Sequence, residues 1–300
     1  MYLEALNISP ESSEPSKNGY NYFPILVFYV LVLYDFTRDT LNGLMMLLLN
    51  TQANYSFPLI LKFFDYTNKE LVAGILLVAG VIITFTAVVK PHSQSARVSS
   101  AIYFIVSKGF IFSATRYNHY YIPMMWALLC LSLYSPIDSK EGQLFFKKVY
   151  SLCLFSIASF YTFPGVWKFV FGLTQGTLTK SAFGANTIAF FFLTQGQESS
   201  LGPILIEYPN LTYLGFLGVI FFQISSIYAW YNQKYQRLWA LGILAFHIIS
   251  IFALNVNFFV AGMVTFIFFY LSPFIDRKND WLAMLMHPLN LLKIRKSSPS

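Results

Sequence analysis

The sequence predicts an all-α fold, a polytopic integral membrane helical bundle of about eight transmembrane or partly spanning segments. Of 300 residues, 56% are hydrophobic and 11% are charged, whereas soluble domains average about 25% charged residues. The charges gather in short polar stretches between long apolar runs, as in chains that cross a bilayer. Backbone polar groups inside lipid must be paired within their own segment, so these runs are predicted to be helices.

Eight apolar runs define the predicted helices. A full span needs about 20 residues, so the third, fourth, seventh and eighth runs are short. The first run contains Asp35, Arg38 and Asp39, and is either one helix with an internal polar step or an interfacial helix followed by a span. The runs are residues 23–49, 70–89, 98–114, 121–136, 149–170, 211–231, 238–253 and 257–272.

Basic residues between the runs predict the orientation. If the N-terminus is cytoplasmic, the cytoplasmic stretches hold 13 of the 20 Lys and Arg residues and the outer stretches hold 4. Positive charge favours the cytoplasmic side, so both termini are expected inside, at the inner (plasma) membrane. This bias accounts for the net charge of +7 without a nucleic-acid partner.

Composition divides the chain into three parts. Residues 1–22 form a polar cytoplasmic N-terminus, residues 23–275 the transmembrane domain, and residues 276–300 a basic cytoplasmic tail on the inner leaflet. The longest outer connection, residues 171–210, includes the apolar stretch 188–193. That stretch is too short to span, so we expect a re-entrant or interfacial helix that caps a cavity.

Ionisable groups inside apolar runs are costly, by at least about 2.5 kcal/mol, so each suggests a function or a specific partner. Lys168 lies near the outer end of its run, beside Trp167. One interpretation is a lysine that extends to the headgroups next to an interfacial tryptophan. The other is an amine that faces an internal cavity, where desolvation disfavours its charged form and lets it act as a base.

Asn118 and His119 lie in an outer turn, directly after Tyr117. They form either a polar loop or a hydrogen-bonding pair aimed at a reacting oxygen. The predicted orientation places this pair and Lys168 on the same side of the membrane.

Other polar residues also interrupt the apolar runs. His247 predicts either an interhelical hydrogen bond or a functional group. Asn255 and Asn257 form either a tight turn or the polar lining of an outer cavity.

Three charged residues of the first run form a cluster. Asp35 can pair with Arg38 on one helix face. Alternatively, Lys108 of the third run can pair with one of the acids at positions 35 and 39.

The two cysteines, Cys130 and Cys153, each lie inside an apolar run. Without a CxxC or Cys/His spacing, they are interpreted as buried, inert thiols, and no metal site is predicted.

Three elements, in this order, resemble the HTTM family, the transmembrane core of vitamin K-dependent gamma-carboxylase and its bacterial relatives. Tyr117-Asn118-His119 before an aromatic-rich run resembles the family's Asn-His element. Residues 161–168, Tyr-Thr-Phe-Pro-Gly-Val-Trp-Lys, resemble its Tyr-x-x-Ala-Gly-x-x-Lys element. Phe246-His247, followed by Phe258-Phe259 and Ser272-Pro273-Phe274, resembles its last pair of spans. The resemblance covers residues 98–275.

This resemblance implies a quinol-dependent carboxylase- or epoxidase-like enzyme, a lyase or oxygenase whose cofactor is a reduced quinone. Lys168 corresponds to the base that deprotonates vitamin K hydroquinone, and His119 to the histidine that stabilises charge on the quinone oxygens, with Asn118 orienting. In the carboxylases, oxygen then adds, and the resulting alkoxide removes a proton from a glutamate γ-carbon, which captures carbon dioxide. The implied partner is a secreted peptide. The implied quinone cavity is lined by Tyr117, Trp167, His247, Asn255 and Asn257.

Two departures from the family lead to alternatives. The family's Lys-Lys pair reads Trp167-Lys168 here, and the carboxylases continue into a large soluble domain that this sequence of 300 residues lacks. Carboxylation of a propeptide-bearing protein is therefore not expected. The alternative is a non-catalytic HTTM protein that assists maturation, export or immunity of a secreted peptide. A further alternative is an unrelated transporter or lipid-binding protein, for which an internal repeat is expected but none is evident.

Overall fold

The structure, a computed structural model, describes residues 23–49, 69–114, 121–133, 140–174 and 199–275. Within these ranges every regular element is a helix and no β-strand occurs, so the all-α prediction is confirmed for them. The helices are α1 (Phe23–Leu49), α3 (Lys69–Val89), α4 (Gln94–Ala114), α5 (Ile122–Ser132), α6 (Lys140–Thr174), α9 (Gly202–Glu207), α10 (Pro209–Ile224), α11 (Ser226–Tyr231), α12 (Gln233–Leu254), α13 (Phe259–Thr265) and the π-helix η2 (Phe266–Tyr270).

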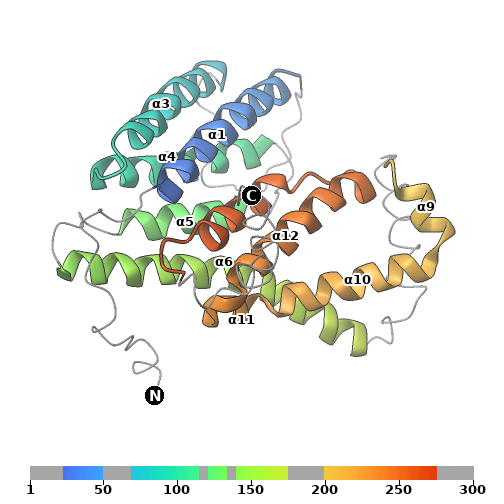
Figure 1. Cartoon of the computed structure of the whole chain (residues 1–300). Helices are drawn as coiled ribbons and strands as arrows, with labels where there is room; N and C mark the ends of the chain where they lie inside the picture. The colour runs from blue at the N-terminus through green and yellow to red at the C-terminus, as the bar shows by residue number, and fades with distance from the viewer. Residues whose placement is uncertain (1–22, 50–68, 115–120, 134–139, 175–198, 276–300) are drawn as a thin grey trace, which may run out of the picture.

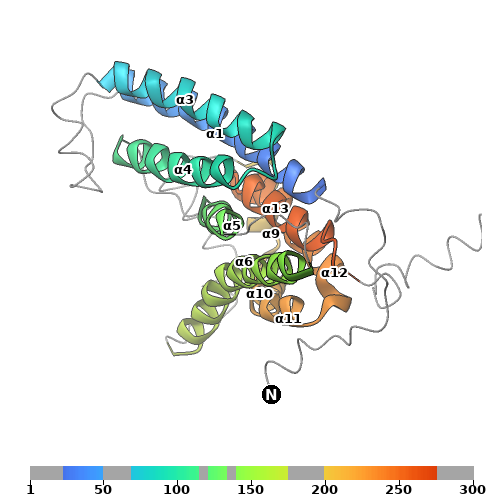
Figure 2. The ribbon, with the colours of Figure 1, turned by 90° about the vertical axis from the view of Figure 1, so that its left-hand side faces the viewer.

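The helices pack in successive layers (Figures 1 and 2). Helices α1 and α3 lie side by side and cover α4, which packs against α5. Helix α5 in turn packs against α6, and α10 and α11 lie on α6. Helix α12 packs against α13 and η2 and so completes the C-terminal half. Helix α6 therefore connects the N-terminal and C-terminal halves of the bundle.

Within the described residues, three helical stretches are long and apolar enough to cross a membrane. They are residues Gly142–Thr174, Pro209–Tyr231 and Gln233–Leu254. Gly74–Val89, Ile122–Ser132 and Phe259–Tyr270 are apolar but shorter. These lengths are compatible with a membrane protein, whereas the predicted number of spans and their orientation rest on the sequence pattern.

Several predicted boundaries differ from the structure. The run 149–170 belongs to a helix of 35 residues, α6, which continues through Pro164. The run 211–231 breaks at Ser225 into α10 and α11. The run 121–136 is helical over Ile122–Ser132, while the run 23–49 is one helix. The helix α1 therefore continues past its charged residues, of which Asp35 pairs with Lys108 of α4.

Some predicted segments lie outside the described residues. These are the polar N-terminus, the apolar stretch 188–193 and the basic tail. Of the outer connection 171–210, the structure describes the end of α6 and the residues from Ser199 onward, including α9.

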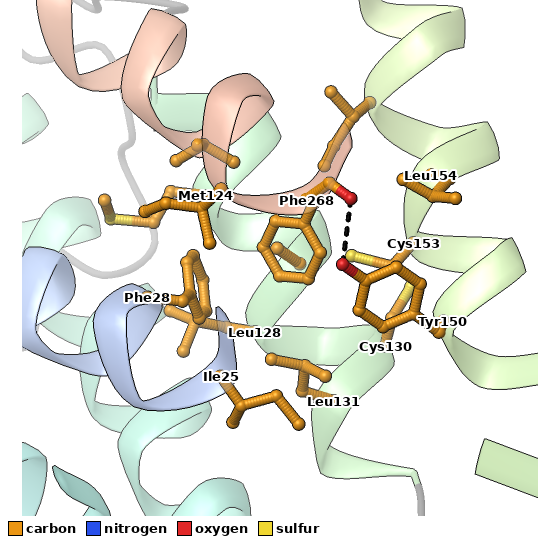
Figure 3. Close-up of a cluster of buried hydrophobic side chains, with 14 of the residues drawn as sticks. Ile25, Phe28, Met124, Leu128, Cys130, Leu131, Tyr150, Cys153, Leu154 and Phe268 are labelled. Atoms are coloured by element: carbon orange, nitrogen blue, oxygen red, sulfur yellow. Dashed lines mark hydrogen bonds between the residues drawn. The ribbon is translucent and has the colours of Figure 1, made fainter. Parts of the chain in front are cut away.

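The core forms where α1, α5, α6 and η2 meet (Figure 3). Phe28, Met124 and Leu128 pack there with Phe268, all of them almost completely buried. Cys130 and Cys153 lie in the same cluster as free, buried thiols, as the sequence predicts.

The π-helix η2 is stabilised by side chains from two other helices. A π-turn changes the backbone pairing, and carbonyl groups around it need other donors. The Tyr150 hydroxyl donates to the Phe268 carbonyl at 2.8 Å, and Arg237 Nε donates to the Tyr270 carbonyl at 3.1 Å. Helices α6 and α12 thereby fix the position of η2.

The buried Arg97 closes the end of α5. Its Nε donates to the Leu131 carbonyl at 2.9 Å, and its Nη1 donates to the Pro91 carbonyl at 2.7 Å. The last carbonyls of a helix lack intrahelical partners, so a guanidinium there satisfies them. This contact brings the start of α4 to the end of α5.

Candidate functional site

One face of α6 carries the polar residues of the candidate site. Tyr161, Gly165 and Lys168 lie at positions i, i+4 and i+7, which share one side of an α-helix. Tyr161 and Lys168 are therefore separated by about 10 Å along the helix axis. This face meets α10, α12 and α13, so residues distant in sequence surround it.

Lys168 makes a hydrogen bond across the α6–α10 contact. Its Nζ donates to Oε1 of Gln223 at 3.2 Å. Lys168 as a whole is exposed on α6, while Gln223 is only 6% exposed. The amine thus turns back toward a buried amide, and its partner is a neutral group.

Exposed aromatic side chains lie close to Lys168 in the sequence of α6. Trp167 is 66% exposed and stacks on Phe171 with ring centroids 5.8 Å apart, and Phe163 is 71% exposed. Such rings suit an apolar surrounding, as do the interfacial tryptophans of membrane proteins. At 3.6 residues per turn, Trp167 and Phe163 project about 100° and about 140° around α6 from Lys168, so these rings form a separate aromatic face of the helix.

His247 belongs to a buried hydrogen-bonded group that joins α12, α6 and α13. Its Nε2 lies 2.8 Å from the Tyr161 hydroxyl, and the Thr265 hydroxyl donates to Tyr161 at 3.2 Å. His247 is 4% exposed, and its Nδ1 has no hydrogen-bond partner within the described part of the chain. The structure thus contains the interhelical hydrogen bond that was one of the two interpretations of this histidine.

Gly262 leaves the room that the imidazole occupies. A Cβ at this position would lie 3.0 Å from Cδ2 of His247 and 3.1 Å from its Cβ. A side chain at this position would require the imidazole or the two helices to shift slightly, so the glycine favours the close approach of α13 to His247.

Asp35 and Lys108 form an ion pair between α1 and α4. Lys108 Nζ lies 3.0 Å from Asp35 Oδ2, and both side chains are almost fully buried. The same Nζ lies 3.5 Å from the centroid of the Tyr121 ring and 5.2 Å from that of Phe104. The prediction that Lys108 pairs with an acid of the first run is therefore confirmed at Asp35.

Asn255 and Asn257 form the turn between α12 and α13. Asn255 has φ 52° and ends α12, a conformation that Asn adopts more readily than most residues. The Oδ1 of Asn257 accepts from the Phe259 N–H at 3.1 Å. Both residues act here as turn and cap residues.

The predicted partners of Lys168 in the outer turn, Tyr117, Asn118 and His119, lie outside the described residues. The proximity of His119 to Lys168 therefore stays a prediction. Among the residues that the structure describes, no three His, Cys, Asp or Glu side chains gather where they could hold a metal ion.

Sequence reasoning missed Gln223 and Thr265 as members of the site. An amide within Phe-Phe-Gln-Ile and a hydroxyl within Val-Thr-Phe were visible in the apolar runs. Both are uncharged, and only their contacts with Lys168 and Tyr161 distinguish them.

Comparisons with known proteins add no relative. No family model matches the chain, and neither a curated protein nor a solved structure matches it.

Proposed function

We propose that this chain is a multi-pass membrane protein of the HTTM kind, in which Lys168 acts as a base toward a reduced quinone. The observation that carries the proposal is the shared face of α6. It holds an amine, Lys168, and a buried hydroxyl, Tyr161, that is bonded to an imidazole. An ionisable residue within an apolar helix of a membrane protein is costly, so it is a functional-site hypothesis by default.

The chemistry that Lys168 supplies is proton acceptance. A neutral amine within hydrogen-bond distance of a phenolic hydroxyl takes its proton, and the resulting ammonium stabilises the oxygen that becomes negative. A reduced quinone supplies two such hydroxyl groups and two electrons for a later oxidation. Phe163 and Trp167 expose aromatic rings on another face of the same stretch of α6, so the surroundings of this part of the helix suit an apolar ligand.

The roles of the other residues follow from their contacts. His247 is held by Tyr161 and packs on Gly262, so it fixes α12 and α13 against α6. In this proposal, Asn118 and His119 approach the same quinone from the outer turn, and a secreted peptide is the candidate acceptor substrate. Lys108 is not proposed as the base, because its amine is buried against Asp35 between α1 and α4.

The test uses the full chain in membranes supplied with vitamin K hydroquinone and oxygen. Loss of quinol is followed by chromatography and compared with membranes that lack the chain. Lys168→Ala is expected to reduce turnover by about 10²-fold or more, since a general base contributes that much. Lys148→Ala is the matched control, because it removes an exposed lysine from the same helix.

Two results would overturn the proposal. One is turnover by the original chain no higher than in membranes without it. The other is full turnover by folded Lys168→Ala protein.

A second candidate is the non-catalytic membrane protein that assists maturation, export or immunity of a secreted peptide. The exposed aromatic surface of Phe163 and Trp167 favours it, since such a surface also suits a partner helix. This candidate predicts background quinol turnover and a secreted peptide that depends on the chain. Replacing Trp167 with Ala would then impair peptide maturation or immunity while Lys168→Ala would not.

A further inference from the structure

We infer that Gln223 is a positioning residue, whose side-chain carbonyl holds the Lys168 amine at the crossing of α6 and α10 without adding negative charge. This inference rests on the proposed role of Lys168 as a base. Its test measures the amine directly, so it can fail or succeed separately from quinol turnover.

The crossing itself depends on Gly165. A Cβ at this position would lie 2.7 Å from the Gln223 Cβ and 2.9 Å from the Ile224 backbone N. Any side chain at 165 would therefore push α10 away from α6. Gly165 lies one turn before Lys168, so the close approach occurs where the lysine needs a partner.

Two hydrogen bonds fix the backbone at Gln223 and its neighbour Phe222. Its backbone carbonyl accepts from the Ser226 hydroxyl at 2.7 Å, and the Phe222 carbonyl accepts from Trp239 Nε1 of α12 at 3.0 Å. These contacts surround the break between α10 and α11 at Ser225. The Gln223 side-chain amide therefore projects from a backbone segment that hydrogen bonds from α12 and from the Ser226 side chain fix in position.

The neutrality of the amide has a chemical consequence. An amide carbonyl accepts a hydrogen bond from an ammonium and also from a neutral amine. A carboxylate at the same place favours the ammonium, so a smaller fraction of the lysine would be neutral and able to accept a proton. Gln223 can thus orient Lys168 in both protonation states, whereas the partner of Lys108 is the carboxylate of Asp35.

The experiment is reductive methylation of the full chain in detergent with formaldehyde and cyanoborohydride across a series of pH values. Formaldehyde condenses with a neutral amine and releases water, and hydride from cyanoborohydride reduces the imine to a methylamine. The modified fraction of Lys168 is read by mass spectrometry of its peptide. The pH at half-maximal rate then reports when the amine becomes neutral.

Two substitutions at position 223 should move this profile in different ways. Gln223→Glu should raise the midpoint pH by about one unit or more, because the new carboxylate stabilises the ammonium. Gln223→Met, which keeps the length but cannot accept as the carbonyl does, should release the amine. Its methylation rate should then rise toward that of exposed Lys148.

Gln233→Glu is the control, since it adds the same charge at a half-buried position at the start of α12. It should leave the Lys168 profile unchanged. Each variant is measured on its monodisperse fraction. Gln223→Glu should slow methylation of Lys168 at a given pH and Gln223→Met should speed it, so either variant alone tests the inference if the other does not fold. A wild-type profile in whichever position-223 variant folds would overturn the inference. A shifted profile together with absent quinol turnover would instead reject the proposed function and retain the role of Gln223.

Discussion

Lys108 and Lys168 are two lysines in apolar helices, and their surroundings differ in kind. Lys108 is buried between α1, α4 and α5, with a carboxylate at 3.0 Å and an aromatic ring below its ammonium. Lys168 projects from α6 and donates to a neutral amide of α10. The ion pair of Lys108 joins two helices, whereas the neutral partner of Lys168 adds no charge that favours the ammonium over the neutral amine. From the sequence alone, both lysines carry the same expected free-energy cost of placing a charged group inside an apolar helix.

The largest stability effect should come from removing Lys108. Lys108→Ala leaves the Asp35 carboxylate buried without its partner, which typically costs about 3–5 kcal/mol. Thermal unfolding of the detergent-purified protein, followed by circular dichroism, should show the loss.

Replacing both partners tests the cause. The double variant Asp35→Asn and Lys108→Met removes both charges, so it should recover much of the lost stability. If the double variant is as unstable as Lys108→Ala, the unpaired carboxylate is not the reason.

A smaller effect is expected at the hydrogen-bonded group of α6, α12 and α13. Tyr161→Phe removes the hydroxyl that contacts both His247 and Thr265 while it keeps the ring. Interhelical hydrogen bonds in membrane proteins contribute about 0.6 kcal/mol on average and at most about 1.7 kcal/mol. The same unfolding measurement should place this variant between the original chain and Lys108→Ala, and a loss equal to that of Lys108→Ala would contradict the ranking.

The smallest stability effect should come from Lys168→Ala. Its side chain is exposed and its partner is uncharged, so the free energy of unfolding should change by no more than about 0.5 kcal/mol. The comparison with Lys108→Ala then distinguishes a lysine that stabilises the fold from one proposed to act as a base. A destabilisation as large as that of Lys108→Ala would make Lys168 a structural residue and remove the contrast.

Much of the helical layout could be predicted from apolar runs, because backbone groups in an apolar environment must pair within a helix. The residues at which the helices begin and end were harder to predict. Polar residues such as Lys140 extend α6 beyond its apolar part, and Ser225 breaks a run whose hydropathy stays high. Hydropathy averages over a window, so it does not report a local change in backbone pairing such as the π-turn at Phe266–Tyr270.

The order of residues already specified which polar groups would lie inside apolar helices, because composition and spacing along one chain fix the helices and their faces. It named Lys168, His247, Asp35 and Lys108 in this way. The partners emerged only from packing, since the acceptors are on other helices: Gln223 is 55 residues from Lys168, and Tyr161 is 86 residues from His247. A side chain's protonation and orientation depend on such through-space neighbours, and these are set when helices dock at small residues such as Gly165 and Gly262.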